Sequence, residues 1–188
     1  MSRLVFMRIG VISTGSMGTT IGHLCQQNGH EVCWASEGRS ENSCQNALSM
    51  GFTDLKSRDL LVDGVDVVFC VVSGDGNALD VAQFCVDKHF SGIFVDGNTL
   101  ADEKTEQFLL DIAKPLKFVS LAIRGWTVFD GDWAKPEQAQ MFLSGEYAGL
   151  VASLLVNPSW SLTLNPSRSP KGIIRELLHR DKQKYANN

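Results

Sequence analysis

Short apolar runs alternate with amphipathic segments along most of this chain. Residues 9–12 form an apolar run of strand length. A glycine-rich segment follows, and apolar residues then recur at helical spacing, at Met17, Ile21, Leu24 and Cys25. The first pattern is typical of a buried strand and the second of a helix with one apolar face. The run 65–72 is almost continuously apolar, which predicts a central parallel strand covered on both faces.

The alternation continues toward the end of the chain. Further strands are predicted over 31–35, 92–96, 118–123, 140–143 and 159–164. Helices are predicted over 45–50, 81–85, 108–112 and 145–156. This order implies an α/β fold, a doubly wound and mainly parallel Rossmann-type sheet with right-handed crossovers and a short C-terminal helix. We expect one domain over 1–165, followed by a linker and the C-terminal amphipathic helix over 166–188.

Four polar, glycine-bearing turns follow predicted strands. They cover 13–18, 36–40, 72–76 and 96–99. In doubly wound sheets, ligands bind beyond the carboxyl ends of the strands. Because these turns are expected along that one edge, the sequence predicts a site for a dinucleotide.

The first of these turns has the properties of a phosphate site. Free N–H groups and the positive end of the helix dipole favour an anion at a helix start. Gly15 lets the backbone approach a pyrophosphate, and Gly18 lets the helix pack against the strand. Ser13 stands where the usual motif has its first glycine, so an ordinary tight strand-to-helix turn is the alternative.

The second turn bears on the choice of nucleotide. Glu37 lies near the position where a carboxylate accepts hydrogen bonds from a ribose 2′-hydroxyl, which favours NAD. Arg39 and Ser40 follow, and a guanidinium with a hydroxyl suits a 2′-phosphate, which favours NADP. A solvated turn is the alternative. We favour NADP, with NAD the less favoured cofactor, because Glu37 can turn to water whereas Arg39 has an evident anionic target.

Composition narrows the class of protein. The 188 residues carry a net charge of −4, but Ser167–Asn188 holds six Lys/Arg against two Asp/Glu. An acidic body with a short basic tail argues against a nucleic-acid partner. The sequence has neither an apolar run of membrane-spanning length nor a recognisable signal peptide. Five cysteines without a close pair favour free thiols in the cytoplasm and no metal site.

Several ordered motifs resemble one family. The segments Arg8–Gly18, Gly29–Val32, Glu37–Ser40, Val95–Thr99 and Phe142–Gly145 are similar to the NAD(P)-binding domain of 6-phosphogluconate dehydrogenase and its β-hydroxyacid dehydrogenase relatives. The resemblance covers roughly residues 8–156 and is far more specific than the glycine turn alone.

The resemblance implies cofactor contacts in each turn. It places the pyrophosphate at Ser13, Thr14, Gly15, Ser16 and Met17, with Gly18 completing the loop. It places a 2′-phosphate at Arg39 and Ser40, and the ribose and nicotinamide beside Val72, Ser73, Asn98 and Thr99. The alternative for residues 96–99 is a turn that only caps a helix.

The sequence departs from the family in two places. The glycine-rich substrate loop is reduced to residues 119–125, where Ser120 replaces an aspartate and only Gly125 remains. Arg124 there is a candidate for gripping a substrate carboxylate or phosphate, with a surface arginine the alternative. Relatives continue into an all-helical domain that supplies a proton-transferring lysine. Lys171 lies near that position in unlike surroundings, so a helix-surface lysine is its default interpretation.

Two functions follow from the resemblance. The first is an NADP-dependent oxidoreductase that transfers hydride to or from a small hydroxy acid or sugar acid, with its substrate site completed by an absent helical domain or a partner subunit. The second is a non-catalytic NADP-binding sensor or remnant module. The apolar residues of the C-terminal helix, Ile173, Ile174, Leu177 and Leu178, also predict packing on the body or a homodimer through this helix.

Overall fold

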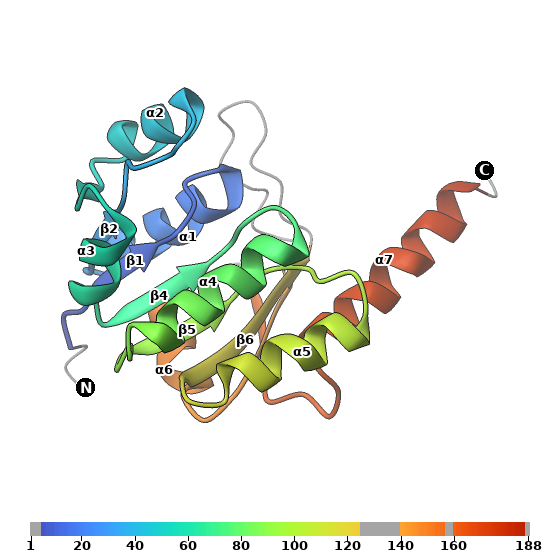
Figure 1. Ribbon diagram of the computed structural model, residues 1–188. Helices are drawn as coiled ribbons and strands as arrows, with labels where there is room; N and C mark the ends of the chain where they lie inside the picture. Colours follow the sequence, from blue (N-terminus) through green and yellow to red (C-terminus); the bar gives the residue numbers. More distant parts are fainter. Residues whose placement is uncertain (1–4, 125–139, 157–159, 187–188) are drawn as a thin grey trace.

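The computed structural model of the chain describes residues 5–124, 140–156 and 160–186. They form one eight-stranded sheet in the order β3-β2-β1-β4-β5-β6-β7-β8 (Figure 1). The strands are β1 (Arg8–Val11), β2 (Glu31–Trp34), β3 (Thr53–Asp54), β4 (Val67–Cys70), β5 (Ile93–Asp96), β6 (Lys117–Arg124), β7 (Gln140–Ser144) and β8 (Ser161–Leu164). All neighbours pair in parallel except β6 and β7, which are antiparallel.

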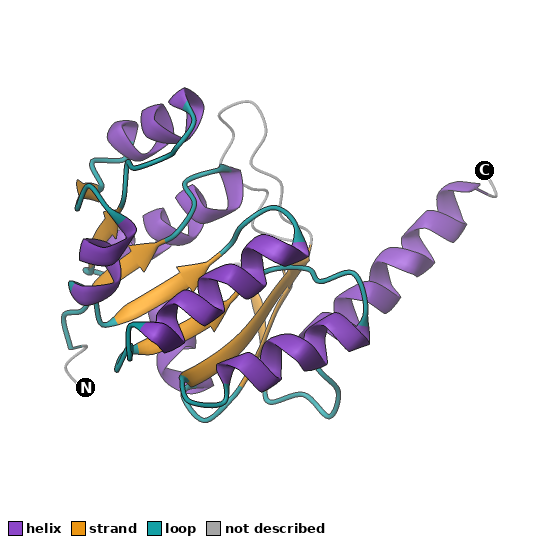
Figure 2. Ribbon diagram, in the orientation of Figure 1, coloured by secondary structure: helices purple, strands orange, loops and turns teal. Residues whose placement is uncertain are grey.

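Helices cover both faces of this sheet (Figure 2). They are α1 (Ser16–Gln27), α2 (Glu41–Ser49), α3 (Arg58–Asp63), α4 (Asp75–Asp87), α5 (Glu103–Ala113), α6 (Ala148–Leu154) and α7 (Pro170–Ala186). Side chains of α1 and α6 belong to the core on one face, and those of α3, α4 and α5 to the core on the other. The prediction of a mainly parallel doubly wound sheet is therefore confirmed.

Three elements differ from the sequence prediction: the start of α2, and the short elements β3 and α3. Helix α2 begins at Glu41, four residues before the predicted start, because the Ser40 hydroxyl accepts a hydrogen bond from the Ser43 amide at 3.3 Å and caps the helix. The sequence did not predict β3, a two-residue strand, or resolve α3, whose six residues are too few for a clear helical period.

The C-terminal helix differs most from its expectation. It covers 17 residues, as one helix from Pro170 to Ala186. Figure 1 shows it extending away from the sheet beyond its first turns. Of its four apolar residues only Ile174 is buried, while Leu178 is 42% exposed. The expected apolar face therefore does not pack on the body as a whole, because only the first turns of α7 reach β6 and β7.

Two further properties of the described residues bear on the class of protein. No helix among them combines the length and apolarity needed to cross a bilayer. All five cysteines are free thiols, and all except Cys44 are buried. Burial raises the pKa of each buried thiol, to about 12 for Cys85, so these sulfurs stay protonated and unreactive near neutral pH.

The junction between β1 and α1 is the tightest contact near the predicted phosphate turn. A Cβ atom built on Gly18 would lie 1.8 Å from the carbonyl oxygen of Ser13 and 3.0 Å from a Val11 methyl group. The obstacle is backbone, which cannot move aside as a flexible side chain can. Gly18 therefore sets the distance between the strand and the helix.

Replacing Gly18 with alanine should destabilise the fold. We expect the free energy of unfolding to fall by about 3 kcal/mol, because overpacking a tight contact forces a backbone shift. Urea denaturation measures this change. Gly149→Ala is the matched control, since its Cβ would meet nothing within 4 Å in α6, and it should leave stability unchanged or raise it. Equal stabilities of the two variants would contradict the proposed tight contact.

Candidate nucleotide-binding site

The turns after β1, β4 and β5 meet around a cavity of about 260 Å³. It lies at the carboxyl ends of these parallel strands, where the sequence predicted a ligand site. Its described lining residues come from these three turns and the start of α1: Ser13, Gly15, Ser16, Met17, Gly18, Val71, Val72, Ser73, Gly97, Asn98 and Thr99. The structure therefore brings together most of the residues proposed to contact a cofactor.

The start of α1 presents free backbone amides to this cavity. Gly15 is the N-cap residue of the helix and makes no side-chain capping bond. By contrast, α2, α3 and α5 are capped by side chains of Ser40, Ser57 and Asp102. A Cβ on Gly15 would meet only the Ser13 hydroxyl, at 3.9 Å, so the space beside it is open. The arrangement fits the phosphate groups of a nucleotide.

Thr14 has a different place from its neighbours in the turn. Its side chain is 1% exposed, and its hydroxyl donates a hydrogen bond to the Ser43 carbonyl at 2.7 Å. The Thr14 carbonyl accepts hydrogen bonds from the Asn46 side-chain nitrogen at 3.0 Å and from the Thr19 hydroxyl at 2.9 Å. Thr14 does not line the cavity, and its side chain instead joins the first turn to α2.

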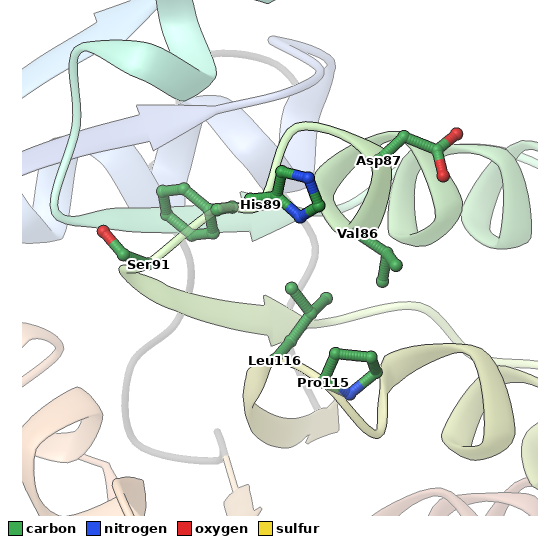
Figure 3. A pocket seen from close by; sticks show the side chains of 7 residues that line it. Val86, Asp87, His89, Ser91, Pro115 and Leu116 are labelled. Carbon is green, nitrogen blue, oxygen red and sulfur yellow. The ribbon is translucent and has the colours of Figure 1, made fainter.

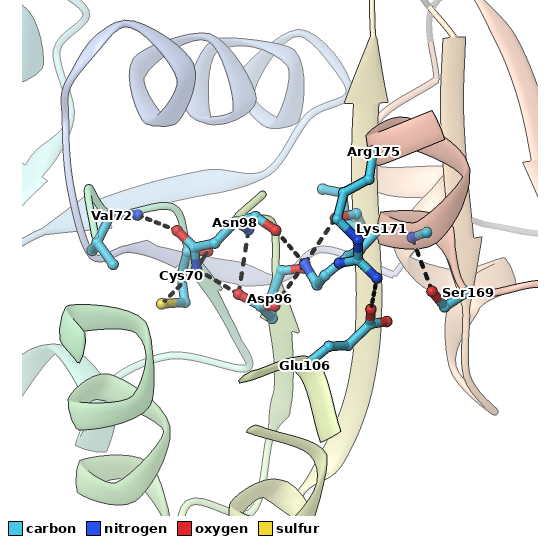
Figure 4. Close-up of polar contacts among 10 residues, drawn as sticks. Cys70, Val72, Asp96, Asn98, Glu106, Ser169, Lys171 and Arg175 are labelled. Carbon is cyan, nitrogen blue, oxygen red and sulfur yellow. Dashed lines mark hydrogen bonds and ion pairs between the residues drawn. The ribbon is translucent and has the colours of Figure 1, made fainter. Parts of the chain in front are cut away.

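Asn98 links the ends of β4 and β5 at the wall of the cavity (Figure 4). Its side-chain oxygen accepts a hydrogen bond from the Val72 amide at 2.6 Å. Its side-chain nitrogen donates to the Cys70 carbonyl at 3.1 Å and also to a carboxylate oxygen of Asp96. Both the oxygen and the nitrogen of this side chain are thus engaged by protein, and Asn98 fixes the turns after β4 and β5 relative to each other.

A second cavity of about 310 Å³ adjoins the first, sharing Ser13, Val72 and Ser73. Arg39 and Arg58 both line it, together with one carboxylate among the described lining residues, that of Asp80. The pKa of Arg39 is lowered by burial and by the charge of Arg58. The buried Nε of Arg39 has no hydrogen-bond partner among the described residues. Two neighbouring cations with an unsatisfied donor form a site suited to an anion.

The structure separates the residues that the sequence grouped with Arg39. Ser40 caps α2, and Glu37 accepts a hydrogen bond from the Arg58 amide at 3.4 Å. Neither is among the described residues lining the second cavity. Arg58 was missed because it follows the unpredicted strand β3. Its guanidinium lies 4.0 Å above the Phe84 ring, a contact between residues 26 positions apart that no local pattern reveals.

The two candidates for catalysis and substrate binding lie outside the first cavity. Arg124, at the end of β6, is half-buried and donates a hydrogen bond to the Gln140 side chain at 3.2 Å. Gly125 of the same loop lies outside the described residues. The side chain of Lys171 is 1% exposed, so the interpretation as a helix-surface lysine is wrong. It is buried because the first turn of α7 docks against β6 and directs the ammonium group toward Asp96.

A further cavity, of about 740 Å³, lies elsewhere (Figure 3). It is lined by the end of α4 and by the segments that precede β5 and β6, with His89, Ser91 and Pro115 among its residues. This is the amino-terminal edge of the parallel strands, opposite the glycine turn. Within the described ranges, no three His, Cys, Asp or Glu side chains gather as a metal site would require.

Fold and site together define a nucleotide-binding α/β domain. The family described as the NAD binding domain of 6-phosphogluconate dehydrogenase matches residues 8–125, which include the turns around the first cavity. The chain belongs to this family, and the resemblance inferred from the sequence motifs is confirmed. A comparison with curated proteins found no match by sequence.

Solved structures share this fold at low sequence identity. A conserved protein of unknown function that resembles 3-hydroxyacid dehydrogenases superposes with a TM-score of 0.68 at 21% identity, over 92% of this chain and 62% of its own. The 3-hydroxyisobutyrate dehydrogenase of Mycobacterium tuberculosis, solved with L-serine, has a TM-score of 0.72 at 14% identity, over 93% of this chain and 59% of its own.

An Aspergillus terreus reductive aminase, solved with NADPH and ethyl levulinate, has a TM-score of 0.73 at 14% identity. The match covers 97% of this chain and 64% of that enzyme. This chain therefore spans about three fifths of the length of these solved relatives. At such identities the likeness establishes the fold and leaves the substrate class open.

Asp54 holds the turn that carries Arg39. Its carboxylate accepts hydrogen bonds from the amides of Ser36 at 3.1 Å and Lys56 at 2.8 Å, and it pairs with the Lys56 ammonium at 2.8 Å. Burial acts to raise the pKa of Asp54, but the hydrogen bonds from Lys56 and Ser36 outweigh it and lower the pKa to about 2. The charged carboxylate is thus the form that the folded turn favours.

Asp54→Asn should lower the free energy of unfolding by about 2 kcal/mol at pH 7, the equivalent of the pKa difference between folded and unfolded states. Because the folded pKa is depressed, this contribution is present above about pH 4 and is lost as the pH falls toward 2. Urea denaturation from pH 7 to pH 2 measures it. Asp59→Asn, at an exposed carboxylate, is the control and should change stability little. A pH-independent difference would contradict the assignment.

Proposed function

We propose that this chain is the NADP-binding part of an oxidoreductase that transfers hydride to or from a small hydroxy acid or sugar acid. The observation that carries the proposal is the first cavity, in which an uncapped helix start faces the turns after β4 and β5. Bound NADP supplies the hydride chemistry through its nicotinamide. The residues of this chain bind the cofactor's phosphates, fix its position and form the wall beside Asn98.

The preference for NADP over NAD rests on the second cavity. The 2′-phosphate is the group that distinguishes the two cofactors, and it carries two negative charges at neutral pH when fully ionised. Arg39 and Arg58 supply the matching positive charge beside residues shared with the first cavity. In the proposed complex, Arg39 donates to this phosphate, whereas Glu37 stays engaged with the Arg58 amide. Contact between Ser40 and the phosphate stays a prediction.

The proton-transfer step needs a group that the first cavity does not itself provide. Its lining residues in the described part of the chain have no ionisable side chain. Lys171 lies near the position of the family's proton-transferring lysine, in unlike surroundings, and its ammonium contacts the backbone oxygen of Asn98, a wall residue. Arg124 stays the candidate for binding a substrate carboxylate. The greater length of the solved relatives supports completion of the substrate site by a further domain or a partner subunit.

The same lack of ionisable lining residues favours a second candidate, an NADP-binding sensor or remnant without turnover. An NADPH consumption assay distinguishes the two, using both oxo acids and carbonyl–amine mixtures because the solved relatives include a reductive aminase. Tight binding without consumption supports the sensor. Homodimerisation through α7 and a cytoplasmic location stay predictions.

Gly15→Val should weaken cofactor binding without unfolding the protein. The Gly15 backbone has φ −67° and ψ −178°, a conformation open to valine, but the added methyl groups would occupy the phosphate space. We expect NADPH affinity, measured by fluorescence titration, to fall more than about tenfold. Stability should change by less than about 1 kcal/mol. Gly149→Val is the matched control away from the cavity, and undiminished NADPH binding by Gly15→Val would overturn the proposed phosphate site.

Arg39→Ala tests the nucleotide preference. Loss of a charge-assisted hydrogen bond of about 1.5–3 kcal/mol should weaken NADPH roughly 10–100-fold and NADH by less than about threefold. Competitive titration with both cofactors measures the ratio. Lys114→Ala removes the same charge from the exposed end of α5 and should leave both affinities unchanged. Equal losses for NADPH and NADH would show that Arg39 does not contact a 2′-phosphate.

A further inference from the structure

A buried ion pair lies behind the wall of the first cavity (Figure 4). The Lys171 ammonium is 2.7 Å from a carboxylate oxygen of Asp96, and the two side chains are 1% and 0% exposed. The ammonium also donates to the backbone carbonyls of Asp96 at 3.3 Å, Leu121 at 3.5 Å and Asn98. One side chain of α7 therefore connects the end of β5, the interior of β6 and the cavity wall.

Hydrogen bonds of the Asn98 side chain connect this ion pair to the wall of the cavity. The other Asp96 carboxylate oxygen accepts a hydrogen bond from the Asn98 side chain, whose oxygen in turn accepts from the Val72 amide at 2.6 Å. Val72 and Asn98 both line the first cavity. An uninterrupted chain of polar contacts thus runs from α7 through Asp96 and Asn98 to the turn after β4.

Stability alone does not account for this arrangement. Burying two charges costs desolvation free energy that their attraction often only balances, and apolar residues of similar size serve as well. The helix also has a second tether, because Arg175 pairs with Glu106 of α5 at 2.8 Å. That second pair includes no residue lining the first cavity. What Lys171 adds is a fixed position for the backbone of residues 96–98.

We propose that Lys171 is a positioning residue for the cofactor, acting through Asp96 and Asn98 on the cavity wall. Its ammonium compensates the buried carboxylate, and the Asp96 carboxylate then holds the Asn98 amide in the orientation that binds the Val72 amide. The inference rests on the proposed cofactor site. Because coupling between two sites is reciprocal, the contact of Lys171 with Asp96 and Asn98 strengthens cofactor binding, and the cofactor strengthens that contact.

The test compares the binding of two ligands to the 188-residue chain. NADPH reaches both cavities, whereas 2′,5′-ADP carries only the adenosine half with its 2′-phosphate. Lys171→Met keeps a side chain of similar length without the charge, and it should weaken NADPH about tenfold or more while changing 2′,5′-ADP less than about twofold. Arg175→Met, which removes the other tether of α7, is the control and should leave both affinities within about twofold.

A second variant and a measurement on the wild type distinguish the proposed role of Lys171 from a folding defect. Asp96→Asn combined with Lys171→Met leaves no uncompensated buried charge, and it should still bind NADPH weakly because the three carbonyls have lost their donor. In the wild type, NADPH should slow hydrogen exchange at the amides of Gly172 and Ile173 about tenfold or more, and 2′,5′-ADP should not.

The outcomes separate this inference from the function on which it rests. If the wild type binds neither NADPH nor NADH, the proposed cofactor function is wrong, and the positioning role is excluded with it. If the wild type binds NADPH and both Lys171 variants bind it as tightly as the wild type does, the positioning role alone is overturned. A loss of turnover without a loss of binding assigns Lys171 to the chemistry instead. Equal weakening of NADPH and 2′,5′-ADP shows a general structural defect and also overturns the inference.

Discussion

The approach of α1 to the end of β1 at Gly18 is the constraint on which the first cavity depends. With no Cβ at this position, the helix starts close against the Ser13 carbonyl. That closeness orients the uncapped amides of the first turn toward the space beside Gly15. A larger residue would move the helix and with it the dipole that attracts an anion. Packing and ligand recognition at this turn are therefore consequences of the same missing side chain.

Electrostatics then distinguishes the parts of the site. Where the described residues leave donors unsatisfied, as at the start of α1 and at the Arg39 guanidinium, they form places for an anionic ligand. Where charge is satisfied internally, as between Lys171 and Asp96, it fixes backbone instead. The contrast follows from the cost of burying charge. A cation without an ion-pair partner among the described residues is tolerated at the half-exposed Arg39, whereas the fully buried Lys171 needs its carboxylate and three carbonyls.

Much of this arrangement could be predicted from the sequence because it is encoded locally. The apolar run 65–72 indicated β4, and the turn after each parallel strand fell on the expected edge of the sheet. Contacts between distant segments could not be predicted. Arg58, which follows the unpredicted strand β3, lines the second cavity and stacks on the Phe84 ring. Lys171 is buried because α7 docks against the sheet. Periodicity indicates which face of an element is apolar, but it does not indicate which distant residue contacts a charged side chain.

The types of residue that line the first cavity bear on the function of the chain. The described residues around the first cavity are suited to holding a nucleotide: glycines, small hydroxyls, backbone amides and Asn98. Hydride transfer with proton movement also needs an acid or base placed against the substrate, and such a group works only within hydrogen-bonding reach of the reacting atoms. In this fold the ammonium of Lys171 is engaged on the protein side of the cavity wall. Chemistry suited to a nucleotide is thus placed in the turns after β1, β4 and β5, whereas the charge of Lys171 reaches the wall of the cavity from the side of α7.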